Sequence, residues 1–327
     1  MRYELEQFSP AIIRAAADRI ARLATRTPLV RLDHDGPAEI WLKLEILQPF
    51  RAFKIRGAAN AMLAADPAEL EQGAWVASAG NMAQGVAYCA RELRVPCTAV
   101  VPEGAPDTKV RAIRQLGAAI VEVPFHDWYR IYETHEYPGM TGHFVHAFSD
   151  PHVMAGNATI GLEVLEDLSE IDAVIVPYGG GGLSCGIAAL VRQMSPGTAL
   201  YGAEVDTAAP LAAAFEAGEP VTIEHQRTFI DGIGGPGLFA EMWDFAARVL
   251  DGAVVSSVNE IRQAIRHLAT HNAIVAEGAG AASVAPALAG RVMKRSNEPA
   301  RRVVCVVSGG NIDSAVLADI LREGGGQ

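Results

Sequence analysis

Short runs of β-branched residues alternate along this chain with longer, alanine-rich stretches. The short runs predict strands at Ile40–Leu44, Trp75–Ser78, Thr98–Val101, Ile120–Val123, Phe144–His146, Ala173–Val176, Leu200–Ala203 and Val303–Val307. The stretches between them predict helices at Ile55–Ala65, Met82–Leu93, Thr108–Leu116, Val153–Asp167, Leu183–Met194, Val258–Ala269 and Ala279–Leu288. This alternation is typical of parallel sheets covered by helices.

The apolar character of individual runs supports the same fold class. Runs such as AVIVP and RVVCVVS are apolar on both faces, as interior strands of a parallel sheet are. One strand–helix block spans about Ala74 to Phe148, and a second series begins at Asp150. We therefore expect two α/β domains with a cleft between them, and ligands in such folds bind at the carboxyl ends of strands.

Composition narrows the class of protein. The formal net charge of -11 argues against nucleic acid as a partner. The start of the chain has no apolar stretch behind a basic cluster, and no window is long and apolar enough for a membrane helix, so we expect a cytoplasmic protein without a membrane partner. The four cysteines, Cys89, Cys97, Cys185 and Cys305, form no CxxC pair, and we expect them to be reduced and buried, with no metal motif.

A tetraglycine segment, Pro177 to Leu183, follows a predicted strand and opens a predicted helix. Four glycines let the backbone approach a ligand closely, and the helix start adds a positive dipole. This pattern predicts an anion site, most simply for a phosphate. It is neither a Walker loop nor a good GxGxxG fingerprint, since that count ends at Ser184. The alternative is a mobile loop.

Two further segments carry candidate chemistry near predicted helix starts. Lys54 lies between Phe53 and Ile55, which would desolvate its amine and lower its pKa, whereas a lone lysine is normally a solvated charge. In the segment Ser78–Gly85, backbone N–H groups and the Asn81 amide could hold a carboxylate or a phenolic oxygen. The alternative for that segment is a helix cap by Ser78 or Asn81.

Two small-residue segments complete the set. Ser308–Asn311 follows an apolar strand, where a serine hydroxyl could bond a ring nitrogen; the alternative is a capped helix beginning at Ile312. In Glu277–Ala281, small residues permit either close helix packing or close approach of a ligand.

Taken together, these segments resemble the fold-type II pyridoxal-phosphate (PLP) enzymes, most closely the serine/threonine dehydratase and serine racemase branch. The matching stretches, in the family's order, are Thr27–Val30, AFKIRGA, SAGNxAQGVA, GGGGL, EGAGA and SGGN, and they extend from residue 27 to residue 311. The resemblance implies a tryptophan-synthase-β-like fold of two three-layer α/β/α domains with mostly parallel sheets and the cofactor in the cleft. It implies a large PLP-binding domain of residues 1–73 and 150–327, and a small mobile domain of residues 74–149.

The resemblance also implies roles for individual residues. Lys54 would form the Schiff base with PLP and move the α-proton, and Phe53 would pack against the ring. The phosphate would be held by Gly179, Gly180, Gly181, Gly182 and Leu183. Asn81 would bond the 3′-oxygen and Ser308 the pyridine nitrogen, with Glu277 also at the cofactor. The loop of Ser78, Ala79, Gly80 and Asn81 would bind the substrate carboxylate through backbone donors, and Met82 would also lie at the substrate.

This chain departs from the family's pattern at four places. The racemases of the branch carry a serine where this chain has Ala79, so a second acid/base is missing and we favour elimination. Met82 stands where histidine is usual. Arg51 replaces a small residue before the Phe-Lys pair, and it either reads a second carboxylate of the substrate or is a solvated loop arginine. Glu204 matches one ligand of a divalent cation site, but Pro210 occupies the second position, so no metal is expected.

The expected activity is PLP-dependent dehydration and deamination of a β-hydroxy amino acid such as L-threonine or L-serine, giving a 2-oxo acid and ammonium. The alternatives are an amino-acid racemase, a β-replacing synthase, a β-hydroxyaspartate or phenylserine dehydratase, and a non-catalytic amino-acid-binding or nucleotide-binding protein. The resemblance suggests a homodimer. The chain ends soon after the SGGN segment, so an added regulatory domain is not expected.

Overall fold

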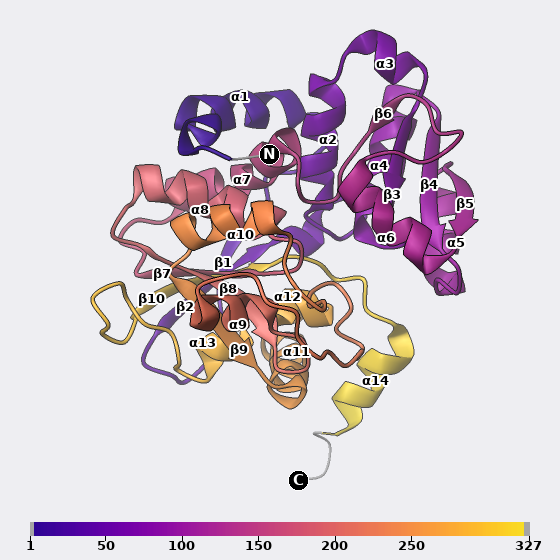
Figure 1. The fold of residues 1–327 in the computed structure, drawn as a ribbon. Coiled ribbons are helices and arrows are strands. Elements are labelled where there is room, and N and C mark those ends of the chain that lie inside the picture. The colour runs from indigo at the N-terminus through magenta and orange to yellow at the C-terminus, as the bar shows by residue number, and fades with distance from the viewer. Residues whose placement is uncertain (1–2, 324–327) are drawn as a thin grey trace.

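Two separate sheets organise residues 3–323, the part of the chain that this computed structural model describes (Figure 1). The larger sheet has six strands in the order β1-β2-β10-β7-β8-β9. These strands are β1 (Leu29–Arg31), β2 (Glu39–Leu44), β7 (Ala173–Pro177), β8 (Ala199–Val205), β9 (Gly252–Ser256) and β10 (Arg302–Val307). Only β1 runs antiparallel to its neighbour among the described strands, as a short edge strand.

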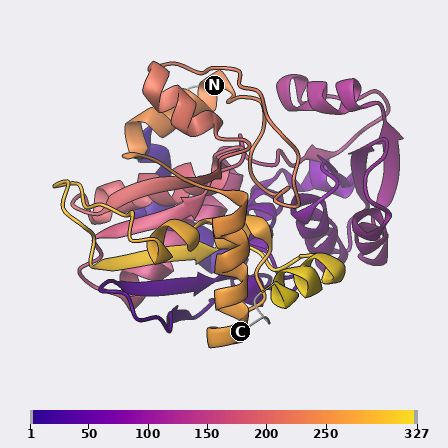
Figure 2. The same ribbon diagram turned by 90° about the horizontal axis from the view of Figure 1, so that it is seen from below.

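The smaller sheet has four strands, all parallel, in the order β5-β4-β3-β6. They are β3 (Ala74–Ala77), β4 (Cys97–Pro102), β5 (Ala119–Val123) and β6 (His143–Phe144). We call residues 74–144 the small lobe and the remaining described residues the large lobe. Figure 2 shows the small lobe set to one side of the rest of the chain.

Helices surround both sheets. They are η1 (Leu5–Phe8), α1 (Pro10–Ile20), η2 (Glu45–Leu47), α2 (Lys54–Ala64), α3 (Pro67–Glu71), α4 (Asn81–Leu93), α5 (Asp107–Gln115), α6 (Phe125–Thr134), α7 (Pro151–Asp167), α8 (Gly182–Met194), α9 (Pro210–Ala217), α10 (Ala240–Val249), α11 (Val258–Asn272), α12 (Gly278–Ala282), α13 (Ala285–Leu288) and α14 (Ser314–Arg322).

Alternating side chains of the central strands explain the layers of the large lobe. Along β10, Val304 and Val306 join one apolar cluster with α7, α8 and α10, whereas Val303, Cys305 and Val307 join another with α11, α12 and α13. A strand covered by helices on both faces must be apolar at every position, which is why this run shows no polar alternation. The large lobe is thus a three-layer α/β/α structure.

The small lobe is built in the same way, and α2 of the large lobe packs against it. Val76 packs with α2 and α4 on one face of the small sheet, whereas Trp75 packs with Ile131 of α6 on the other. Helix α2 also packs along α7 of the large lobe. The helix that begins at Lys54 therefore lies between the two lobes.

The predicted fold class is confirmed, with differences in individual elements. The strand predicted at Phe144–His146 is His143–Phe144. The helix predicted at Ala279–Leu288 is two short helices, because Pro286 near the start of α13 has no N–H to continue a helix. The helix after the SGGN segment begins at Ser314, capped by Asp313, rather than at Ile312.

Several elements were not predicted: η1, α1, η2, α3, α6, α9, α10, β1 and β9. The division into domains 1–73 with 150–327 and 74–149, and the mobility of the smaller one, stay predictions.

Among residues 3–323, no helix is long and apolar enough to cross a membrane. The same residues contain no cluster of three or more histidine, cysteine or acidic side chains that could hold a metal ion. All four cysteines are free and buried, as predicted.

Candidate active site

Lys54 begins α2, and its amine is withdrawn from water. The amine donates a hydrogen bond to the carbonyl oxygen of Ala147 at 2.8 Å and lies 5.1 Å from the centre of the Phe53 ring. No carboxylate among the described residues forms an ion pair with it. Burial without a compensating acid lowers the pKa of Lys54 to about 8, so this amine gives up its proton far more readily than an exposed lysine does. The sequence prediction of a desolvated lysine thus agrees with this environment.

The segment before Lys54 is held against the segment after β10. Ala52 pairs with Gly309 in an antiparallel bridge, and the Phe53 N–H donates to the Ser308 carbonyl at 2.9 Å. Ser308 is only 3% exposed, and its hydroxyl makes no hydrogen bond to other described residues. These contacts bring the predicted ring-nitrogen partner Ser308 beside the predicted Schiff-base lysine, although 254 positions separate them in the sequence (308 minus 54).

A buried ion network fixes the first turn of α2. Arg56 is 1% exposed, and its guanidinium pairs with Glu45 at 2.8 Å and with Glu163 at 2.6 Å. Glu163 also pairs with the buried Lys43 amine at 2.6 Å. Two cations and two anions balance within the network, so each charge has a partner away from water. Sequence reasoning missed this network, although Arg56 lies in the AFKIRGA stretch.

The tetraglycine loop joins β7 to α8 and presents unpaired backbone donors. The N–H groups of residues 179 to 184 make no hydrogen bond to any described residue, and α8 has no side-chain cap. Gly181, which precedes α8, has φ +89°, a conformation that L side chains rarely adopt. Consecutive free N–H groups at a helix start form an anion site. The loop therefore fits a phosphate, as the sequence predicts.

Phe148 lies against this loop and explains why its residues are glycines. A Cβ atom on Gly180 would lie 2.3 Å from the Phe148 ring, and one on Gly182 would lie 2.5 Å from the Phe148 carbonyl oxygen. Because Phe148 follows Ala147, the acceptor of the Lys54 amine, the lysine and the glycine loop meet across these two residues. Leu183 has its side chain in the large-lobe core, so its backbone N–H is the group available to a ligand.

Tyr178, immediately before the glycines, has a buried hydroxyl without a hydrogen-bond partner among the described residues. A Cβ atom on Gly181 would lie 2.8 Å from this hydroxyl oxygen. Burial raises the pKa of Tyr178 well above its usual range, so the group stays a neutral O–H.

The loop before α4 is a second set of free donors. The Ser78 hydroxyl accepts from the Gly80 N–H at 3.2 Å, and no side chain caps α4. The alternative of a helix cap by Ser78 or Asn81 is therefore wrong. The N–H groups of residues 81 to 83 have no partner among the described residues, which suits a carboxylate. The Met82 side chain is 2% exposed and lies in the small-lobe core, so only its backbone faces this loop opening.

Asn81 reaches across to the large lobe. Its Nδ2 donates to Glu277 Oε1 at 2.9 Å, and its Oδ1 accepts from Asn311 Nδ2 at 2.8 Å. Glu277 also accepts from the Asn311 backbone N–H at 3.1 Å. Burial, together with the nearby Asp231 carboxylate, raises the pKa of Glu277 to about 7 despite these donors. The predicted site residues Asn81 and Glu277 thus contact each other directly.

Two other candidates have different surroundings. Arg51 is exposed, has φ 63°, and its guanidinium has no partner among the described residues. Glu204 is fully buried, and its carboxylate accepts from the Leu211 and Ala212 N–H groups at 2.8 Å each. Glu204 thus caps α9, which gives its carboxylate a structural task, and burial raises its pKa to about 7.

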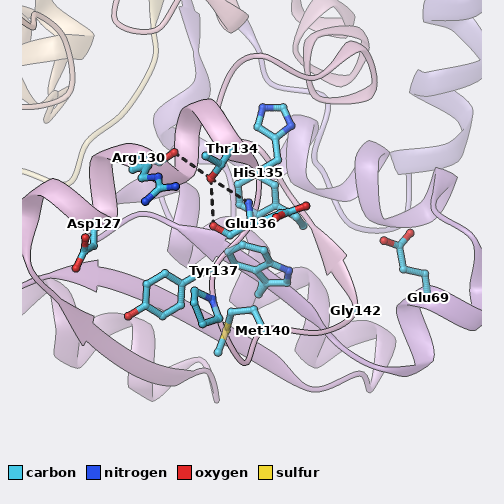
Figure 3. Close-up of a pocket in the computed structure, with 12 residues that line it drawn as sticks. Glu69, Asp127, Arg130, Thr134, His135, Glu136, Tyr137, Met140 and Gly142 are labelled. Atoms are coloured by element: carbon cyan, nitrogen blue, oxygen red, sulfur yellow. Dashed lines mark hydrogen bonds between the residues drawn. The ribbon is translucent and has the colours of Figure 1, made fainter.

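A hollow of about 800 Å³ lies on the small lobe away from these segments (Figure 3). It is lined by Glu69, Trp75, Asp127, Arg130, Thr134, His135, Glu136, Tyr137, Pro138, Met140, Gly142 and Phe144. The single hydrogen of the Thr134 hydroxyl there is within reach of the carbonyl oxygens of Arg130, in the same helix, and Glu136, just after the helix end. None of the predicted site residues lines this hollow.

The lysine amine withdrawn from water and the run of free N–H donors beyond Ala147 and Phe148 suit a cofactor that carries both an aldehyde and a phosphate. A model of the family described as "Pyridoxal-phosphate dependent enzyme" matches residues 20–309. This chain belongs to that family, and PLP is its cofactor.

Individual relatives narrow the branch. The L-threonine ammonia-lyase of Thermotoga maritima is 37% identical over 293 residues, covering 88% of this chain and 70% of the relative. The catabolic L-threonine dehydratase of Escherichia coli K12 is 37% identical and covers 93% of each chain. Among solved structures, a threonine deaminase of Solanum lycopersicum matches with a TM-score of 0.87 at 29% identity, covering 98% of this chain and 93% of the other. Maize serine racemase matches with a TM-score of 0.85 at 28% identity, covering 96% of each.

Proposed function

We propose that this enzyme dehydrates and deaminates a β-hydroxy amino acid, such as L-threonine or L-serine, to a 2-oxo acid and ammonium. The observation that carries the proposal is the desolvated Lys54 amine, joined to the tetraglycine loop across Ala147 and Phe148. Relatives that are 37% identical to this chain over the aligned residues are named L-threonine ammonia-lyase or dehydratase, which supports the same reaction.

One group of residues would bind the cofactor. PLP, when bound, supplies an aldehyde that links to amines and a ring that withdraws electrons from the substrate's α-carbon. We assign the phosphate to Gly179, Gly180, Gly181, Gly182 and Leu183, through the free N–H groups of the loop. Phe53 would pack against the ring, and the Ser308 hydroxyl, which has no partner of its own, would bond the ring nitrogen.

The substrate is held from the small lobe. We assign its carboxylate to the free N–H groups at the start of α4, from Asn81 to Ala83. Ser78, Ala79 and Gly80 would line the same binding site. The Lys54 Nζ then takes the α-proton, since a neutral amine is a competent base at a pH near its pKa.

Two features favour elimination over racemisation. Ala79 has no proton to exchange, so a second acid/base is absent from that position. The neutral hydroxyl of Ser308 does not hold a proton on the ring nitrogen as a carboxylate would. Charge on the α-carbon is then less well stabilised, which favours prompt departure of the β-hydroxyl group.

The finer sequence predictions belong to the same proposal. We propose a homodimer in the cytoplasm, with a small domain of residues 74–149 that moves relative to the rest. Arg51 is exposed and unpaired, which supports a test of 3-hydroxyaspartate as a substrate with a second carboxylate.

A coupled 2-oxo-acid assay over L-threonine, L-serine, 3-hydroxyaspartate and phenylserine tests the activity, and chiral analysis of the amino acid tests racemisation. Lys54→Ala should abolish turnover, the absorbance of bound PLP, and any lysine trapped by borohydride. Lys294→Ala, which removes a partly exposed lysine paired with Asp172, is the matched control and should change none of these. Absence of cofactor absorbance in the wild-type protein would instead favour a non-catalytic binding protein. If Arg51→Ala left the kinetics with 3-hydroxyaspartate unchanged, Arg51 would not bind the second carboxylate of that substrate.

A further inference from the structure

Asn311 donates hydrogen bonds to three different segments of the chain. Its backbone N–H bonds Glu277 Oε2 at 3.1 Å, at the start of α12. Its side-chain Nδ2 bonds the Phe50 carbonyl oxygen at 3.0 Å and Asn81 Oδ1 at 2.8 Å. The residue comes from the SGGN segment, in which Ser308 alone was given a role above.

These contacts determine which way the Asn81 amide faces. The Phe50 carbonyl can only accept, so the amide of Asn311 must turn its NH₂ group toward Phe50 and, with the second hydrogen, toward Asn81. Asn81 must then present its oxygen to Asn311. Its own NH₂ group consequently faces Glu277, an acceptor when ionised.

The reversed amide is disfavoured at both contacts. Turning Asn81 by 180° would place its oxygen against the Glu277 carboxylate and its NH₂ against the NH₂ of Asn311. In the observed orientation, one Asn81 N–H is used by Glu277 and the other remains for a ligand. An amide left free to flip would offer an oxygen acceptor to the same ligand part of the time.

We propose that Asn311 is a positioning residue, which locks the Asn81 amide so that its free N–H is presented to the 3′-oxygen of PLP. The inference rests on the proposed function, because it assumes that Asn81 bonds the cofactor. Asn311 itself needs no contact with cofactor or substrate.

The same residue ties Asn81 to the lysine segment. The Gly310 N–H donates to the Arg51 carbonyl at 2.9 Å, and Asn311 bonds the adjoining Phe50 carbonyl. Phe50 precedes Lys54 by four positions, so one short stretch positions both the lysine and the asparagine. Without the Asn311 side chain, the Asn81 amide keeps, among the described residues, only its hydrogen bond to Glu277.

Cofactor binding by purified variants tests this assignment. Asn311→Ala removes both side-chain hydrogen bonds but leaves the backbone hydrogen bond to Glu277. The variant therefore distinguishes the effect of the side-chain amide from that of the backbone of this loop. We expect PLP to bind about tenfold more weakly, as for the loss of one hydrogen bond to a charged oxygen, and the absorbance maximum of bound PLP to shift. Asn272→Ala is the matched control, since that exposed amide also bonds a backbone carbonyl, that of Arg31, and should leave both readouts unchanged.

The double variant distinguishes positioning from a general structural role. If Asn311 acts through Asn81, then Asn81→Ala and Asn81→Ala/Asn311→Ala should bind PLP equally well, within about twofold. Asn311→Asp keeps the size of the side chain and replaces the donor by oxygen, so it should weaken PLP binding at least as much as Asn311→Ala even if the alanine variant folds poorly.

Two results overturn the inference alone: wild-type PLP affinity and absorbance in Asn311→Ala, or additive losses in the double variant. Lowered thermal stability with an unchanged cofactor spectrum would likewise assign Asn311 a purely structural role. A wild-type protein that takes up no PLP would overturn the proposed function itself, so the two failures are distinguishable.

Discussion

Replacing Glu163 by glutamine tests whether the buried ion network holds the start of α2. Glu163 bonds the Lys43 amine at 2.6 Å and the Arg56 guanidinium at 2.6 Å and 3.0 Å. The side chains of Lys43, Arg56 and Glu45 are at most 2% exposed, and that of Glu163 is 9% exposed. Glutamine keeps the shape and one acceptor but removes one of the two negative charges.

The size of the effect follows from the charge balance. The variant leaves two cations and one anion in the buried network. Besides the new glutamine, the Lys43 amine then has the Thr27 carbonyl at 2.6 Å and the partly exposed Asp167 carboxylate at 4.0 Å. Breaking a buried pair by removing one partner costs about 3–5 kcal/mol. Because the glutamine oxygen still accepts from one cation, we expect the lower end, about 3 kcal/mol, or roughly a hundredfold in the folding equilibrium.

Urea unfolding followed by circular dichroism measures the difference in the free energy of unfolding. Glu166→Gln, one turn further along α7, is the matched control: that glutamate pairs with Arg26 at the surface with 43% of its side chain exposed, and we expect a change below about 0.5 kcal/mol. Adding Lys43→Met to Glu163→Gln restores the balance and should cost less than the sum of the single changes. A loss under about 1 kcal/mol in Glu163→Gln, or strict additivity in the double variant, would refute the reasoning.

Three further outcomes are expected. Gly182→Ala should weaken PLP binding at least tenfold in a titration, since its Cβ atom would lie 2.5 Å from a backbone oxygen, whereas Gly197→Ala, with nothing within 4 Å, should bind PLP normally. The rate at which the cofactor-free protein captures PLP, followed by stopped-flow absorbance, should rise with pH and level off above about pH 8, because the Lys54 pKa is lowered to about 8 and only the neutral amine attacks; a flat profile would contradict this. Tyr178→Phe should leave the free energy of unfolding of the cofactor-free protein unchanged or about 1 kcal/mol higher, because it removes an unpartnered buried hydroxyl, and a clear loss would reveal a partner.

The parts of the fold that could be predicted are those whose signal is local. The strand Val303–Val307 is apolar at every position because helices cover both its faces, and that is visible in five consecutive residues. The tetraglycine loop was recognisable for the same reason, since its conformation and its free donors depend on the glycines themselves. Elements with mixed composition were missed, such as the aromatic helix Phe125–Thr134, of which only Ile131 is buried.

Contacts between distant segments could not be predicted from the sequence. Asn81 and Asn311 are 230 positions apart, and nothing near either residue specifies the other. Nothing in the sequence around Arg56 distinguishes it from an ordinary surface arginine. Its burial depends on two carboxylates, of which that of Glu163 is 107 positions away. In both cases a polar side chain acquires its role from partners that the fold supplies.

If the small lobe moves as we propose, the contacts of Asn81 would couple cofactor binding to that movement. Asn81 belongs to the small lobe, and its two partners, Glu277 and Asn311, belong to the large lobe. The glycine loop and Ser308 also belong to the large lobe, so a small lobe that moved away would leave the phosphate and ring-nitrogen contacts in place. It would remove the donors at the start of α4, which we assign to the substrate carboxylate, together with the Asn81 bond to the cofactor. A separation of the lobes that we propose would thus remove a hydrogen-bond donor from the cofactor's 3′-oxygen, and their return would restore both sets of donors at once.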